Sequence, residues 1–324
     1  MMKFITTALA IGMASLAMCL SLASGSPLSF ILFLLAAVPL MTGAMGWGSQ
    51  SAALGAIIAV VLIALVFGFG ASLVFLIAFA VPGWWLGHLA LLGEEASAGN
   101  GQASLTWYPV GRLIVWIVAL GSVITVLGLL TRGTSGEEIN AALSAAIKPH
   151  LPAFRDKLQT IDPQAAAQWD ETAILDMMVS FAPVAIAMTT TAWLTLNLWL
   201  SARITAGLGR LNRPWPDLRA TRLPAMTLLV LFLVASLCFL DGLPGTVARA
   251  TTGALMTAYV LTGFAVLHTL TLGLTGRIFW LIAAYVIAIL FTWALIAVGL
   301  LGIADALFAF RSTSQPPRGR PPPL

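Results

Sequence analysis

The sequence predicts an all-α membrane protein, a polytopic helical bundle of about eight or nine transmembrane helices. Hydrophobic residues make up 60% of the 324-residue chain and charged residues only 9%, whereas a soluble domain carries about 25% charged residues. The apolar runs are about 20 residues long, which is the length of a helix that crosses a bilayer. The short alternating runs typical of a membrane β-barrel are absent. We therefore expect helices, which satisfy their own backbone hydrogen bonds in lipid.

One basic loop, residues 202–223 with Arg203 just inside it, fixes the predicted orientation. This loop contains five arginines and a single acidic residue, Asp217. The arginines are Arg203, Arg210, Arg213, Arg219 and Arg222. Lys and Arg near span ends resist translocation, so we expect this loop in the cytoplasm of a bacterial cell, with the spans in the inner (plasma) membrane. Because successive spans cross the membrane in opposite directions, the nine predicted spans place the N-terminus in the cytoplasm and the C-terminus outside. The tail arginines favour an inner C-terminus, in which case one span, most simply among residues 28–92, is not a true crossing.

The predicted spans are separated by Gly-, Pro- and Ser-containing breaks. In chain order they are residues 1–23, 28–45, 51–66, 72–92, 113–130, 174–201, 226–240, 247–272 and 278–300. The first run also fits a cleaved signal peptide, but the spans that follow favour an uncleaved first helix. Residues 303–310 are too short to cross again. The integral domain is therefore expected to be residues 1–310, followed by a disordered, proline-rich tail at 311–324.

Two local patterns predict how the early spans pack and bend. Ala8 and Gly12 lie one turn apart on the first span, so another helix can approach closely there. Pro82 lacks a backbone N–H and predicts a kink in the fourth span. The small, polar stretch 94–106 after that span is predicted to be a flexible cytoplasmic loop.

The one sizeable polar segment, residues 131–172, is predicted to be extracytoplasmic and amphipathic. Ser135 and Glu138 form a capping box. Apolar residues then recur at helical spacing, at Ile139, Leu143, Ala146, Ile147, Leu151, Phe154, Leu158 and Ile161. This stripe predicts helices that lie on the membrane surface or cap the bundle. Asp162 before Pro163 predicts a further helix start, with the helix running directly into the sixth span.

The sixth span is the most polar of the predicted spans. Five small or polar residues fall near one of its faces: Ser180, Ala187, Thr190, Asn197 and Ser201. Polar groups need partners in lipid, so this face is predicted to point into the bundle. It either forms interhelical hydrogen bonds or lines a substrate or ion site. The candidate substrate-lining residues are Ser180, Thr190, Asn197 and, near the inner end of the eighth span, His268.

Sequence motifs for catalysis or cofactor binding are absent. No His/Cys/Asp/Glu set has metal-ligand spacing, and no phosphate-binding glycine loop or catalytic triad is present. Cys19 and Cys238 lie inside apolar runs as packing residues. We therefore predict no catalytic residue, no metal and no cofactor, and a protein that is not an enzyme. The net charge of +4 resides in span-flanking loops, which does not suggest nucleic acid as a partner.

Four stretches, in their order along the chain, carry a resemblance to a known family. They are Pro-Gly-Trp-Trp-Leu-Gly at 82–87, Trp-Tyr-Pro at 107–109, Asn-Leu-Trp-Leu at 197–200 and Pro-Trp-Pro-Asp-Leu-Arg at 214–219. The chain resembles, over nearly its whole length, the YybS-like family of uncharacterised bacterial polytopic membrane proteins. Its first six spans are distantly similar to the substrate-binding subunits of energy-coupling-factor vitamin transporters. That similarity implies that Ala8 and Gly12 face a membrane-protein partner.

Transporter-like binding of a small molecule is the favoured function. The alternative is a non-transporting membrane scaffold or cell-envelope assembly protein, whose arginine loop docks a partner or anionic lipid. The expected partners are the lipid bilayer and a membrane protein that contacts the first span.

Overall fold

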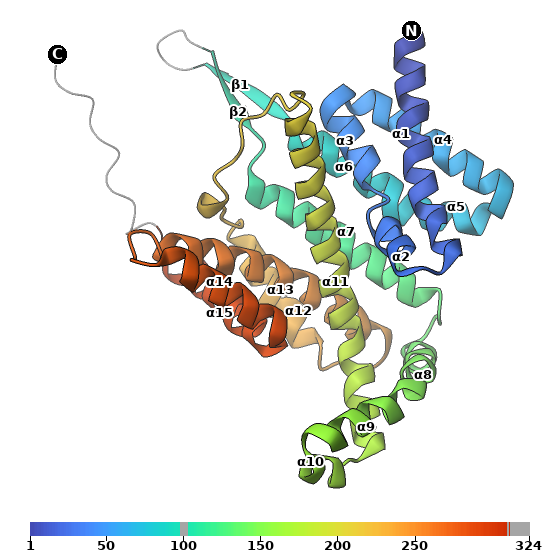
Figure 1. Cartoon of the computed structure of the whole chain (residues 1–324), viewed down its shortest axis with the longest axis vertical. Coiled ribbons are helices and arrows are strands. Elements are labelled where there is room, and N and C mark those ends of the chain that lie inside the picture. Colours follow the sequence, from blue (N-terminus) through green and yellow to red (C-terminus); the bar gives the residue numbers. More distant parts are fainter. Residues whose placement is uncertain (98–102, 310, 312–324) are drawn as a thin grey trace. The chain divides into compact units, whose positions relative to one another are not determined.

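The computed structural model describes residues 1–97, 103–309 and 311, and the regular secondary structure of these residues is helical apart from one two-stranded ribbon. The elements are α1 (Met2–Leu20), α2 (Pro27–Leu34), α3 (Val38–Trp47), α4 (Ser49–Phe67), α5 (Phe69–Phe75), a π-helical turn (Leu76–Ala80), α6 (Val81–Ala90), β1 (Gly93–Ser97), β2 (Ala103–Trp107), α7 (Val110–Leu130), α8 (Gly136–Ile147), α9 (Leu151–Ile161), α10 (Pro163–Ala167), α11 (Glu171–Gly207), α12 (Met226–Leu237), α13 (Gly242–Leu270), α14 (Arg277–Leu290) and α15 (Thr292–Phe308) (Figure 1). The predicted all-α membrane class is confirmed.

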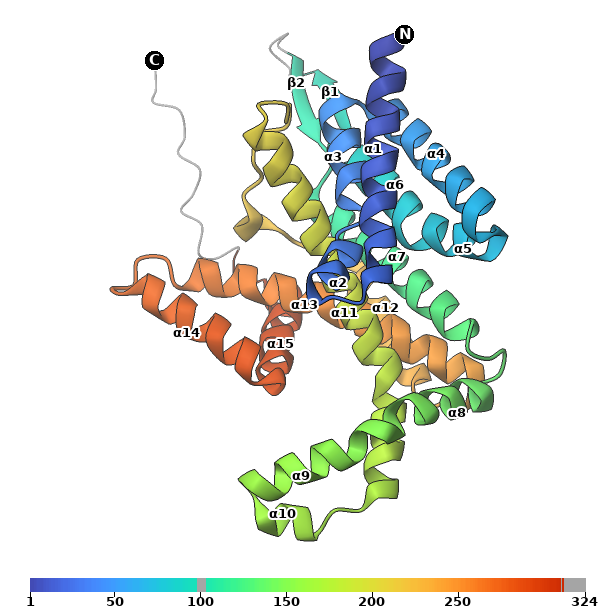
Figure 2. The ribbon, with the colours of Figure 1, turned by 45° about the vertical axis from the view of Figure 1, so that its right-hand side comes forward.

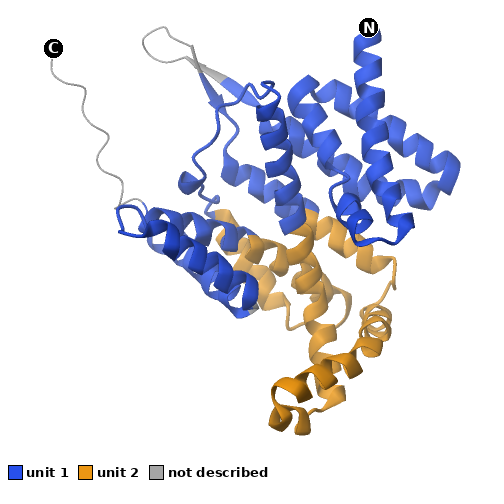
Figure 3. Ribbon diagram, viewed as in Figure 1, with its two compact units in different colours: residues 1–120, 192–225, 258–324 blue, residues 121–191, 226–257 orange. Residues whose placement is uncertain are grey.

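The helices form two compact units, which are coloured separately in Figure 3. Unit 1 comprises residues 1–120, 192–225 and 258–324, and unit 2 comprises residues 121–191 and 226–257. The long helices α7, α11 and α13 are each divided between the two units.

Within the described residues, six helices are long and apolar enough to cross a membrane: α1 with its following 3-10 turn, α4, α5–α6 as one helix, α7, α11 and α13. The pair α2 and α3, bent by 41°, makes a seventh if it is one broken span. The last predicted spans differ from expectation. The expected span 226–240 is α12, whose 12 residues extend only about 18 Å. A bilayer core is about 30 Å thick.

Helices α1 and α4 of unit 1 lie side by side (Figures 1 and 2) because glycines meet at their crossing. A Cβ on Gly12 would clash with the carbonyl of Gly55, and a Cβ on Gly55 would clash with the carbonyl of Ala8. The close approach predicted from Ala8 and Gly12 is therefore confirmed, and the helix that makes it is α4 of the same chain.

The fourth predicted span and the loop after it contain two irregular elements. Pro82 stands at the start of α6, directly after the π-helical turn Leu76–Ala80, where its missing N–H leaves the regular hydrogen-bond ladder interrupted. The expected flexible loop 94–106 is instead an antiparallel ribbon, paired from Gly93 with Trp107 to Ser97 with Ala103. Residues 98–102 of that loop lie outside the described residues.

In unit 2, helix caps follow the predicted residues. Glu138 donates its backbone N–H to Ser135 Oγ (3.2 Å) and accepts from the backbone N–H of Thr134 (2.7 Å). Asp162 caps α10, but that helix ends at Ala167, so the expected direct run into the sixth span is wrong. A second cap, Asp170, starts α11 afresh by accepting the N–H groups of the two residues after Glu171.

The amphipathic stripe of residues 139–161 is only partly covered. Ile139 and Leu151 are fully buried, whereas Phe154 and Ile161 are 57% and 73% exposed. An apolar face left open at the end of α9 is typical of a helix that lies against a membrane surface.

In unit 1, α14 and α15 form a helical hairpin where the sequence predicts a single span at 278–300. The chain leaves the helical conformation at Phe291, and neither helix reaches bilayer length with 14 and 17 residues. Helix α15 packs on α13 through two glycines: a Cβ on Gly263 would meet the carbonyl of Val298, and one on Gly302 would meet that of Tyr259. Residues 303–308 belong to α15 and form no separate segment.

Arginines at both ends of this hairpin bond to backbone carbonyls of unit 1. At its start, Arg277 Nη2 donates to the carbonyl of His268 (3.3 Å). Beyond its end, Arg311 Nη1 donates to the carbonyl of Arg219 in the arginine loop (2.6 Å), and its guanidinium forms a buried ion pair with Asp305 (2.7 Å). Arg311 thus belongs to the folded part, while residues 312–324 of the expected tail lie outside the described residues.

This return of the chain predicts that the C-terminus lies on the same side of the membrane as the arginine loop. In a background without Cys19 and Cys238, Asn212→Cys and a cysteine appended after Leu324 should both be shielded from an impermeant thiol reagent in intact cells. Gln164→Cys, before the 37-residue helix α11, should react. Labelling of the appended cysteine together with Gln164→Cys would show that α14–α15 crosses the bilayer once.

The glycine crossing predicts a second result. Gly12→Leu forces α1 away from α4 and should lower the free energy of unfolding by about 1–3 kcal/mol, the cost of overpacking a close contact. Gly70→Leu on α5 is the matched control, since no atom lies within 4 Å of its Cβ position. Melting temperatures in detergent measure both changes, and equal melting temperatures for the two variants would contradict the crossing.

Candidate functional site

The predicted polar face of α11 splits between the two units. Ser180 is exposed and Thr190 half-buried in unit 2. Asn197 is 3% exposed and Ser201 fully buried in unit 1. None of these residues lines the cavity beside the arginine loop, which is described below. The four predicted substrate-lining residues are therefore not gathered around it, and only His268 is among its walls.

Asn197 and Ser201 instead bond to the bend between α2 and α3. Asn197 Nδ2 donates to the carbonyl of Leu34 (3.0 Å), and Ser201 Oγ donates to that of Val38 (3.3 Å). On the other side of the bend, Ser15 Oγ of α1 donates to the carbonyl of Ala36 (2.6 Å). The carbonyls of Leu34 and Ala36 lie at the break, before α3 begins at Val38. Backbone carbonyls at such a break lose their usual donors and are costly in lipid unless other groups satisfy them. The polar face is thus interhelical hydrogen bonding at these positions.

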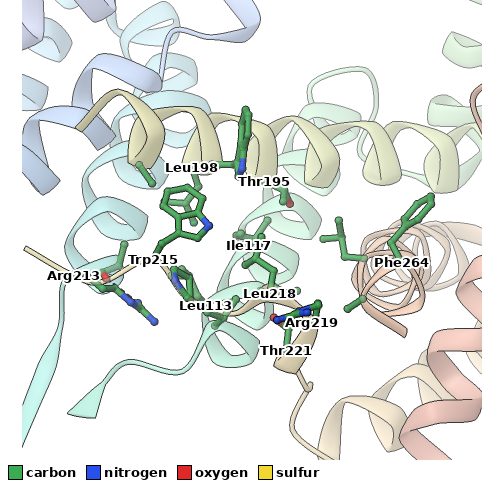
Figure 4. A pocket seen from close by; sticks show the side chains of 18 of the residues that line it. Leu113, Ile117, Thr195, Leu198, Arg213, Trp215, Leu218, Arg219, Thr221 and Phe264 are labelled. Carbon is green, nitrogen blue, oxygen red and sulfur yellow. Dashed lines mark hydrogen bonds between the residues drawn. The ribbon is translucent and has the colours of Figure 1, made fainter. Parts of the chain in front are cut away.

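A cavity of about 540 Å³ lies beside the arginine loop in unit 1, and we call it the loop cavity. Its walls come from the ends of α3 and α6, from α7, α11, α13 and α14, and from the loop itself. Figure 4 shows Leu113 and Ile117 of α7, Thr195 and Leu198 of α11, Trp215 of the loop and Phe264 of α13 around the space. Most of these side chains are apolar, so the cavity suits an apolar ligand.

His268 closes one wall of the loop cavity together with α14. Its Nε2 lies 3.0 Å from the hydroxyl of Tyr285, and Phe264 stacks on the Tyr285 ring at 4.6 Å between centroids. All three side chains line the cavity. The hairpin therefore supplies a polar pair to an otherwise apolar wall.

Two of the loop arginines hold the loop against helix ends. Arg210 donates to the carbonyl of Gly46 (3.3 Å) and stacks over Trp47 at 4.6 Å. Arg213 donates from Nη1 to the carbonyl of Ala90 (2.9 Å) and from Nη2 to that of Tyr108 (3.0 Å). Gly46 and Ala90 lie in the last turns of α3 and α6, where carbonyls are unpaired and the helix dipole favours a cation.

The other loop arginines differ in how their charge is matched. Arg219 forms a two-point ion pair with Asp217 (2.9 and 3.2 Å), and its hydrogen bonds hold the pKa of that carboxyl below its usual value. Arg203 lies over the rings of Trp215 (5.2 Å) and Trp199 (6.0 Å). Arg222 is exposed.

Sequence reasoning missed most of the residues that line the loop cavity. The signal was present in Pro214-Trp215-Pro216, a rigid aromatic turn within the arginine loop, and in Trp199 one turn before Arg203. Tryptophans at span ends are usual in interfacial belts, so Trp199 and Trp215 alone do not indicate a binding cavity. Among the described residues, no group of three His, Cys, Asp or Glu side chains is placed to hold a metal ion.

The apolar helices and the cavity they enclose define a polytopic helical membrane protein. The chain belongs to the predicted membrane protein family DUF2232, whose family model matches residues 12–306. No curated protein and no solved structure matches the chain.

The hydrogen bonds at the α2–α3 bend predict the effect of removing Asn197. Asn197→Ala should lower the free energy of unfolding by about 1 kcal/mol, the usual value of an intramembrane hydrogen bond. Any cellular activity should fall only in proportion to folded protein. Thr189→Ala is the control on the same helix, because Thr189 is exposed and bonds only to its own helix. Loss of activity by Asn197→Ala at unchanged melting temperature and expression would contradict the structural role.

Proposed function

We propose that this protein binds a small, largely apolar molecule in the loop cavity, as the binding step of a transport-like and non-enzymatic function. The observation that carries the proposal is the cavity itself. Its volume of about 540 Å³ falls in the range of small-molecule sites, about 300–1,000 Å³. Its apolar walls with a few convergent polar groups are also typical of such sites.

The location of the cavity supports access from one face of the membrane. It lies where α3, α6 and α11 end and α7 begins, next to the arginine loop. With the loop in the cytoplasm of a bacterial inner membrane, as the positive-inside rule favours, a ligand reaches the cavity from the cytoplasmic side. If α2–α3 counts as one crossing, six spans precede the loop, and the N-terminus then lies in the cytoplasm as well.

The resemblance to substrate-binding subunits of energy-coupling-factor transporters supports the same class of function, whereas the YybS-like resemblance adds no activity. The implied partner surface needs revision, since α4 occupies the face of Ala8 and Gly12. A membrane-protein partner of the first span would use its opposite, exposed face, which includes Ile5, Leu9 and Met13.

The second candidate is a membrane scaffold without a small ligand. The exposed Arg203 and Arg222 favour it, because unpaired cations in a membrane-side loop attract acidic partners and anionic lipid. A scaffold requires no occupied cavity, so cavity occupancy separates the two candidates.

Photo-crosslinking with a long-chain alcohol that carries a diazirine at mid-chain tests the proposal. In nanodiscs of neutral lipid, the probe should label cavity residues such as Ile117 and Phe264, and excess unlabelled alcohol should suppress that labelling. Ile289, which is 81% exposed, should be labelled without saturation, as a lipid-facing residue.

A cavity-filling substitution gives the matched control. Ala202 lines the loop cavity, whereas Ala206, one turn further along α11, is exposed and does not. Ala202→Trp should abolish the saturable labelling and Ala206→Trp should leave it intact. Absence of saturable labelling in the unsubstituted protein would refute cavity binding and favour the scaffold.

A further inference from the structure

The polar groups around the loop cavity share a property that bears on its ligand: none is a carboxylate. Three lining side chains are basic (Arg213, Arg219 and His268) and three are neutral and polar (Thr195, Thr221 and Tyr285). No Asp or Glu is among the lining residues. A cationic ligand would find no opposite charge here, whereas an anionic one would.

Arg213 is the cation best placed to receive an anion. Its guanidinium is half-buried, and no described carboxylate lies within 4 Å of it. The two hydrogen bonds to the carbonyls of Ala90 and Tyr108 fix its position without neutralising its charge. A guanidinium has five N–H donors, so three remain. Burial lowers the pKa of Arg213, which reflects the cost of holding this charge without a counter-ion.

Arg219 provides the contrast within the same loop. Asp217 binds its guanidinium at two points, and the backbone carbonyl of Arg219 accepts a hydrogen bond from Arg311. Its charge is therefore matched, and it serves to hold the cavity wall in place. Within this loop, Arg219 is therefore paired with a carboxylate, whereas Arg213 is not.

Arg203 is a second cation without a carboxylate; it is exposed and does not itself line the cavity, but it contacts residues that do. It lies over Trp215 and Trp199, two aromatic side chains that line the space. No described carboxylate is within 4 Å of Arg203 either. Cation–π contact orients the guanidinium without removing its positive charge.

The apolar part of the cavity continues away from these arginines. In Figure 4, Arg213 and Trp215 lie at one end of the space and Phe264 at the other. Ile117 and Arg219 lie between the two ends. The cation without a carboxylate thus lies at one end of the space. Toward Phe264 the wall is mainly apolar, and its polar groups are Arg219, whose charge Asp217 matches, and the His268–Tyr285 pair.

We propose that the ligand of the loop cavity is an anionic amphiphile: one carboxylate or phosphate group bound at Arg213 and Arg203, carried on an apolar chain or ring system that fills the space toward Phe264. This assignment rests on the proposed function, because it names the class of molecule that occupies the same cavity. The anion is either a free single-chain amphiphile or the headgroup of a membrane lipid.

The experiment compares two diazirine probes of the same chain length, a fatty acid and the corresponding fatty alcohol, in nanodiscs of phosphatidylcholine. The half-saturating concentration for labelling Ile117 and Phe264 should be at least about tenfold lower for the acid, the effect expected of a charge-assisted hydrogen bond. Arg213→Gln and Arg203→Gln should each remove most of that difference, by raising the half-saturating concentration of the acid toward that of the alcohol. Because Arg213 also holds α6, Arg203→Gln keeps the test valid if Arg213→Gln fails to fold.

Arg222→Gln is the matched control: like Arg203 it is an exposed arginine of the same loop, but only Arg203 lies over the lining tryptophans Trp199 and Trp215. It should leave the preference for the acid intact. An equal loss from Arg222→Gln and Arg203→Gln would overturn the assignment in favour of general surface charge. Equal half-saturation by acid and alcohol would also overturn it while cavity binding stands; absence of saturable labelling by either probe would refute cavity binding itself.

Competition then identifies the source of the anion. If phosphatidylglycerol in the nanodisc suppresses acid labelling of Phe264, the site takes a lipid headgroup. If only soluble fatty acid or alkyl phosphate suppresses it, the site takes a free amphiphile. Both results support the assignment.

Discussion

Unit 1 depends on arginine side chains that bind backbone carbonyls at helix ends. Arg210 and Arg213 reach Gly46, Ala90 and Tyr108, and thereby join the loop to α3, α6 and the start of α7. Each contact brings a cation to the negative end of a helix or to an unpaired carbonyl, where it is favourable without any carboxylate. The loop consequently lies across the ends of several helices. The loop cavity is the space between this loop and the helices α7 and α11.

The same preference for carbonyl partners explains the polar residues of α11. A bend of 41° separates α2 from α3, and Ser15, Asn197 and Ser201 donate to its carbonyls. Asn197 Oδ1 is enclosed and accepts no protein hydrogen bond in the described structure, so this amide contributes through its N–H group alone. Asn197 and Ser201 of the α11 polar face therefore lie where the neighbouring chain is bent, and their polarity by itself does not indicate a substrate path.

The sequence was sufficient for features set by local chemistry. Composition indicates the membrane class, the spacing of Ala8 and Gly12 predicts a close crossing, and Ser135 predicts a helix start. The hairpin could not be predicted in this way, because residues 278–300 contain no proline and a single late glycine, so run length alone favours one span. The loop cavity could not be predicted from the sequence either, because its walls come from segments that are far apart in the chain and meet only through tertiary packing.

The bond between Asn197 and Leu34 has a consequence for how the protein is made. The two residues are 163 positions apart, so the bend of α2–α3 enters the membrane well before α11 leaves the ribosome. During that interval the carbonyl of Leu34 has no Asn197 to satisfy it, and an unpaired carbonyl in hydrocarbon is costly. The early helices are therefore an incomplete intermediate during synthesis, and α11 completes them. A chain that stops before α11 is expected to be a substrate for membrane quality control, even though its first helices are individually apolar enough to insert.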